Sequence, residues 1–148
     1  MLPFQKPFFS PVQKALISTA IKSAEQNTSG EIKVHIEPSS KHELAIDRAK
    51  EIFASQNLSK TIERNAVLIY VAYTDRKFAI YGDEGIHEKV GEDFWHKTIE
   101  LMHSHFSKGD FVHGIIAGVN DIGLRLKEHF PYENKGSLNE ISDEISEG

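Results

Sequence analysis

The chain has 148 residues, a formal net charge of −5 and no cysteine. This length suits one domain with a sizeable core, and the lack of cysteine excludes disulfides, thiolate catalysis and cysteine-based zinc sites. The segment from residue 133 holds five acids and one lysine, so the residues before it are close to neutral in sum. Because nucleic-acid binding needs a basic face, no nucleic-acid partner is expected.

The sequence predicts a soluble protein without a membrane span. No stretch approaches the roughly 18 apolar residues that cross a bilayer, and the first residues lack the basic start and apolar run of a signal peptide. We therefore expect a cytoplasmic monomer. We expect residues 1–132 to form a single domain, and residues 133–148 to form an acidic tail that is mobile or loosely docked.

The first half of the chain predicts two helices and a strand. Ser10 followed by Pro11 is typical of a helix start, and this helix should end near residues 27–30. Residues 31–37 alternate apolar and polar side chains, which predicts a strand with one solvent-exposed face. The apolar stripe of residues 44–53 predicts the second helix.

The second half predicts a hairpin followed by helices. Residues 66–73, AVLIYVAY, are apolar throughout and predict a central strand that is covered on both faces. A tight turn at residues 74–76 leads into an antiparallel strand at 77–82. Residues 93–106 and 110–129 have the periodicity of helices. The predicted order is α-β-α-β-β-α-α, an α/β fold with a small mixed sheet.

This topology brings several acids to one rim of the sheet. The first two strands are joined by a helix, so a right-handed crossover should make them parallel, whereas the hairpin makes the second and third antiparallel. The starts of the first two strands and the end of the third then meet. That rim carries Glu31, Glu63, Arg64, Asp83 and Glu84, and Asp110 at the start of the last helix could reach it.

Two interpretations of these acids stay open. Carboxylates on glycine-flanked turns suit hard divalent cations, which prefer oxygen ligands. Alternatively, Asp83, Glu84 and Asp110 only favour the N-termini of the helices that follow them. Arg64 could either neutralise the acids or hold a phosphate.

Five blocks stand out in sequence order: NTSGEIKVHIE, RNAVLIYVAYTDRKFAIYGDEGI, the Phe94–Trp95 pair, FSKGDFVHGIIAGVNDIG and HFP. From residue 8 to residue 132, their order and spacing resemble the TPM domain family, which is named for a thylakoid lumen protein, a photosystem II repair protein and a nematode receptor auxiliary protein. The resemblance implies a three-layer α/β/α sandwich. It departs from many members at Asn65–Ala66, where they have Asn-Gly, and in lacking their signal peptide and C-terminal anchor.

The resemblance also implies functions, because family members resemble Ca²⁺-binding proteins, weak acid phosphatases or accessory proteins in membrane-complex assembly. The first hypothesis is a domain that binds a divalent cation, Ca²⁺ with Mg²⁺ as the other candidate, in a binding or assembly role. By motif, the family's acidic rim falls on Glu31, Asp83, Glu84 and Asp110. The second hypothesis is a metal-assisted acid phosphatase acting on phosphomonoesters, with Asp83 as nucleophile or base and Arg64 holding the phosphate. The third is a metal-independent protein-interaction module.

Overall fold

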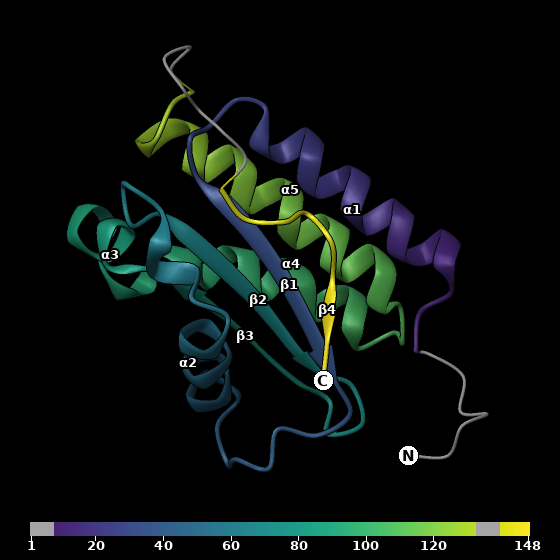
Figure 1. Ribbon diagram of the computed structural model, residues 1–148. Coiled ribbons are helices and arrows are strands. Elements are labelled where there is room, and N and C mark those ends of the chain that lie inside the picture. Colours follow the sequence, from purple (N-terminus) through teal and green to yellow (C-terminus); the bar gives the residue numbers. More distant parts are fainter. Residues whose placement is uncertain (1–7, 133–139) are drawn as a thin grey trace.

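Four strands form one mixed sheet in the order β3-β2-β1-β4 (Figure 1). A computed structural model describes residues 8–132 and 140–148 of the chain. The strands are β1 (Glu31–Glu37), β2 (Ala66–Ala72), β3 (Lys77–Gly82) and the short β4 (Ser146–Glu147). β1 is parallel to β2 and β4, whereas β2 and β3 are antiparallel. The predicted strand directions are therefore confirmed.

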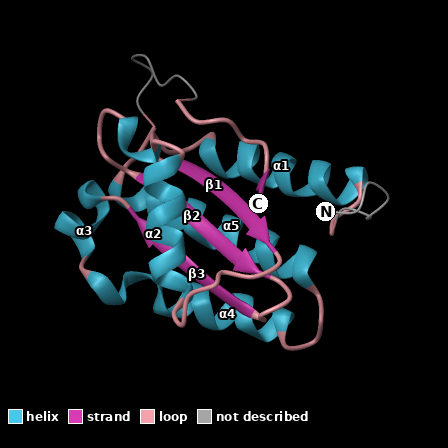
Figure 2. Ribbon diagram, turned by 60° about the horizontal axis from the view of Figure 1, so that its bottom comes forward, coloured by secondary structure: helices cyan, strands magenta, loops and turns pink. Residues whose placement is uncertain are grey.

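Helices cover both faces of the sheet, which gives three layers (Figure 2). The α-helices are α1 (Pro11–Glu25), α2 (Ala45–Ser55), α3 (Glu84–Val90), α4 (His96–Phe106) and α5 (Phe111–His129), and two short 3₁₀ helices cover Leu58–Lys60 and Glu92–Trp95. Side chains of α1, α4 and α5 form one apolar cluster with the sheet, and α2 forms a second cluster on the other face. The α/β class and the element order predicted from the sequence are confirmed.

Two glycines allow α5 to pack closely against α4. A Cβ at Gly114 would lie 2.3 Å from the Phe106 ring, and one at Gly118 would lie 2.5 Å from the sulfur of Met102. Both distances are below 3.0 Å, so a larger residue at either position would force the Phe106 ring or the Met102 side chain to shift. The two glycines thus allow the close approach of α4 and α5.

The prediction of a solvent-exposed face on β1 is wrong, because all seven residues of the strand are buried. Lys33, His35 and Glu37 are 9%, 4% and 5% exposed. Glu37 accepts two hydrogen bonds from Arg48, at 2.8 and 3.1 Å, and another from the Tyr70 hydroxyl. The charge on this face is thus paired inside the protein rather than solvated.

Residues 140–148 lie along the outer edge of β1 (Figure 1). Ile141 is 4% exposed and belongs to the cluster beneath α2. Residues 133–139 of the predicted tail lie outside the described residues, and the division of the chain at residue 132 stays a prediction. Among the helices in the described ranges, none is long and apolar enough to cross a membrane.

Candidate metal centre

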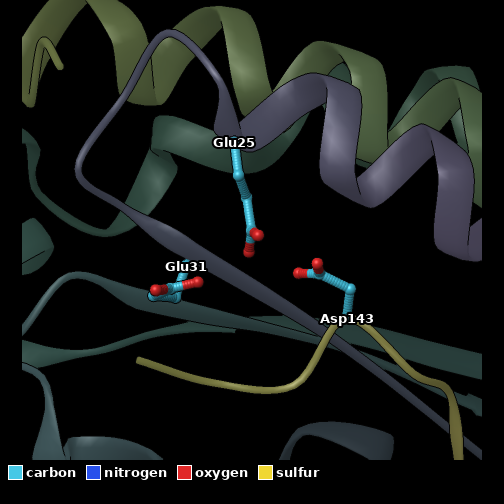
Figure 3. A group of neighbouring side chains, drawn as sticks. All are labelled: Glu25, Glu31 and Asp143. Atoms are coloured by element: carbon cyan, nitrogen blue, oxygen red, sulfur yellow. The ribbon is translucent and has the colours of Figure 1, made fainter. Parts of the chain in front are cut away.

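Three carboxylates from distant parts of the chain meet beside the start of β1 (Figure 3). Glu25 is the last residue of α1, Glu31 is the first residue of β1, and Asp143 precedes β4. One oxygen from each side chain lies within 4.8 Å of the other two. We call these three residues the carboxylate cluster.

A tight turn places Glu25 next to Glu31. After α1, the backbone N–H of Ser29 donates to the carbonyl of Phe130 at 3.0 Å, which ties the turn to the end of α5. Gly30 lets the turn pack tightly, because a Cβ at this position would lie 2.8 Å from a Leu126 methyl group and would force that side chain to shift. The turn brings the Glu25 carboxylate within 2.8 Å of the Ile32 backbone N–H, which donates to it.

Glu31 is 3% exposed, and its two oxygens have different surroundings. Oε1 accepts a hydrogen bond from the backbone N–H of Glu140 at 2.5 Å. Oε2 is buried and accepts no hydrogen bond within the described ranges, while the Glu25 carboxyl lies within hydrogen-bonding reach of the Glu31 side chain. A buried carboxylate oxygen without a partner is costly, so this atom needs a proton or a cation nearby.

The electrostatics of the carboxylate cluster favour a bound positive charge. Burial raises the pKa of Glu25, and the hydrogen-bonding neighbours Asp143 and Glu31 raise it further. Burial also raises the pKa of Glu31. Three ionised carboxylates this close repel one another, so the cluster must either retain a proton or bind a cation.

The predicted site residue Asp83 has a different set of partners. Its carboxylate accepts two hydrogen bonds from Arg64, at 2.8 and 2.9 Å, and one from the Glu84 backbone N–H at 2.8 Å. It is 2% exposed and is the N-cap of α3. The helix-capping interpretation therefore accounts for Asp83, and Arg64 neutralises its charge.

Glu84 and Gly85 complete this turn. The Glu84 side chain is 72% exposed and lies 3.6 Å from Arg64. A Cβ at Gly85 would lie 2.2 Å from the Glu63 carbonyl oxygen, so glycine lets α3 start directly against that loop. The acids at 83 and 84 thus serve the strand-to-helix turn.

Asp110 does not reach the rim that carries Glu31. It is the N-cap of α5, where it accepts from the backbone N–H of His113 at 3.1 Å and contacts its Nδ1 at 2.7 Å. The neighbouring Phe111 ring lies 5.3 Å from Phe8, which stacks on Tyr73 at the far end of β2. The other end of α5 lies by the turn before β1, so the expectation that Asp110 joins Glu31 fails because of the direction of α5.

Sequence reasoning found Glu31 but missed its two neighbours. The sequence predicted that the first helix ends near residues 27–30, whereas α1 ends at Glu25, and a turn of five residues separates Glu25 from β1. The closeness of Glu25 to Glu31 could have been inferred from this short connection. Asp143 gave no such signal, because its acidic segment has no helical or strand periodicity. Among the described residues, this is the one group of three or more acids or histidines with the spacing of a metal site.

Comparison with known proteins identifies the class of this fold. Residues 4–124 match the family model described as the TPM domain, and the chain therefore belongs to the TPM domain family. Glu25 and Glu31 lie within the matched segment, whereas Asp143 lies beyond it. No protein with a curated description matches the chain.

The fold is also similar to solved structures. The NMR structure of BA42 protein from the psychrophilic bacterium Bizionia argentinensis has a TM-score of 0.90 and 37% identity, covering 99% of this chain and 100% of BA42. The N-terminal domain of cg2496 from Corynebacterium glutamicum has a TM-score of 0.64 and 12% identity, with 93% and 90% covered. An N-terminal domain from P. gingivalis has a TM-score of 0.60 and 18% identity, with 82% and 78% covered. The last two support the fold alone.

Proposed function

We propose that this TPM domain binds a divalent cation through Glu25, Glu31 and Asp143, in a binding or assembly role. The observation that carries the proposal is the buried Oε2 of Glu31, which accepts no hydrogen bond in the described ranges. The same side chain meets two further carboxylates, with one oxygen of each within 4.8 Å of the others. A cation would supply the positive charge that these groups need. The donor set consists of hard oxygen ligands, which fits Ca²⁺ or Mg²⁺ rather than a soft metal.

Ca²⁺ is the ion that we propose, because it accepts about six to eight oxygen ligands in a flexible geometry. The three carboxylates come from separate segments of the chain and would supply part of that shell, with water and backbone carbonyls completing it.

No observation favours the phosphatase alternative over cation binding. A phosphatase using Arg64 needs this guanidinium free to hold phosphate, but both oxygens of Asp83 are bonded to it. The same pairing leaves Asp83 a poor nucleophile, because its charge is already neutralised. Acid phosphatase activity and a metal-independent interaction role remain untested predictions.

Isothermal titration of the full chain with CaCl₂ and MgCl₂ tests the proposal. Glu31→Gln keeps the shape of the side chain but removes its charge, and we expect it to weaken Ca²⁺ binding at least about tenfold. Glu84→Gln removes a charge that is 72% exposed and should leave the affinity unchanged. Saturable binding that survives Glu31→Gln in a folded protein would contradict the site.

A further inference from the structure

The segment of residues 140–148 spans the length of β1. At the start of the strand, the backbone N–H of Glu140 donates to Glu31 Oε1 at 2.5 Å. At the other end, the backbone N–H of Gly148 donates to the carbonyl of Ile36 at 2.9 Å. We call residues 140–148 the C-terminal latch.

Few backbone hydrogen bonds hold the C-terminal latch to the sheet. Of the residues in the C-terminal latch, only Ser146 and Glu147 form a strand that pairs with β1. Side chains supply most of the remaining contacts: Lys33 Nζ donates to the Glu144 carbonyl at 2.7 Å, and Lys14 pairs with Glu147 at 2.9 Å. A strand of two residues is marginal by itself, so the attachment depends on these contacts and on the buried Ile141.

The charge of the C-terminal latch opposes its docking at one point. Asp143 is 8% exposed and faces Glu25 and Glu31 across the carboxylate cluster. Here Asp143 of the latch meets Glu25 at the end of α1 and Glu31 at the start of β1 (Figure 3). One proton retained by Glu25 still leaves two negative charges among the three carboxylates, and their repulsion weakens the docking. A divalent cation shared by all three groups would neutralise these charges and hold the latch to the strand.

We infer that a divalent cation bound by Glu25, Glu31 and Asp143 fastens the C-terminal latch to β1, and that loss of the cation releases it. This inference rests on the proposed function, because the same cation is required. The released state exposes the outer edge of β1, and an uncovered strand edge can accept another extended chain. The latch thus makes access to this edge depend on cation concentration.

Amide hydrogen exchange of the full chain tests the inference directly. The Gly148 amide is a suitable probe, because it bonds to Ile36 at the far end of β1 and neither residue belongs to the carboxylate cluster. We expect saturating CaCl₂ to slow its exchange at least about fivefold relative to NaCl at equal ionic strength, since coupling between two sites commonly reaches this size. Unchanged exchange alongside saturable Ca²⁺ binding would overturn the latch and leave the proposed function standing. If no Ca²⁺ binds, both fail.

A second variant tests whether docking of the C-terminal latch in turn affects Ca²⁺ affinity. It weakens the docking but leaves all three carboxylates in place. Ile141→Ala removes buried apolar contacts of the C-terminal latch. Because coupling is reciprocal, it should weaken Ca²⁺ affinity at least about fivefold. Leu124→Ala, at an α5 position that is 64% exposed, is the matched control. Equal Ca²⁺ affinities in the two folded variants would overturn the inference.

Discussion

Glu25→Gln should remove a pH dependence from the stability of the cation-free protein. The raised pKa of Glu25 means that this residue keeps its proton in the native state at pH values where the unfolded chain, with a usual pKa of 4.5, has lost it. The native state then binds more protons than the unfolded state. The contribution of Glu25 to the free energy of unfolding is therefore fully present below about pH 4.5, and it is lost as the pH rises towards the native pKa.

The magnitude follows from the width of the pH window. A difference of one bound proton changes the free energy of unfolding by about 1.4 kcal/mol per pH unit. Between pH 7.0 and 8.5, the wild type should thus lose about 2 kcal/mol more than Glu25→Gln, which corresponds to about 4–8 °C in Tm for a domain of this size. Burial lowers the pKa of His35 below its ordinary value of 6.5, so the titration of the folded-state imidazole lies below this pH window.

Urea denaturation followed by tryptophan fluorescence measures this difference. The single tryptophan, Trp95, is 6% exposed and will report the loss of the core. Saturating Ca²⁺ should flatten the wild-type slope, because a bound cation keeps all three carboxylates ionised. Parallel loss of stability in the wild type and Glu25→Gln between pH 7.0 and 8.5 would refute the reasoning about the carboxylate cluster.

Three further predictions concern residues outside the carboxylate cluster. Arg64→Gln leaves the buried Asp83 without its ion pair and should lower the free energy of unfolding in urea by about 1–3 kcal/mol, with unchanged Ca²⁺ affinity. Weaker Ca²⁺ binding by this variant would place the cation at this turn instead. Gly114→Ala should cost about 1–3 kcal/mol, because the added methyl group clashes with Phe106, and a neutral result would disprove the close packing of α4 and α5. Asp110→Ala removes a helix cap and should cost about 1 kcal/mol without changing a calorimetric Ca²⁺ titration, whereas weaker binding would return Asp110 to the metal site.

The order of the helices and strands was predictable, because the spacing of apolar residues within each element is a local signal in the sequence. The apolar run that became β2 is buried along its length, as a central strand must be. The burial of β1 was not predictable from its alternating pattern. Its polar side chains have partners such as Arg48 and the Glu144 carbonyl of the C-terminal latch, and neither contact leaves a periodic signal near β1.

The candidate site was predictable only in part, for a related reason. Local rules of helix capping explain Asp83, and the sequence already offered that interpretation. The carboxylate cluster instead depends on long-range contacts that join both halves of the chain, from Glu25 to Asp143. Asp110 was misplaced because periodicity predicts a helix but does not tell which end of the sheet its first turn approaches.

The most direct test of the account is an amide NMR titration of the full chain with CaCl₂, using MgCl₂ for comparison. We predict saturable shifts centred on Glu25, residues 30–32 and residues 140–144, where the carboxylate cluster and its hydrogen-bonded neighbours lie. Saturable shifts confined to residues 82–85 or to Asp110 would contradict the site. Small and diffuse shifts would contradict cation binding itself, and the cluster would then be held together by a shared proton.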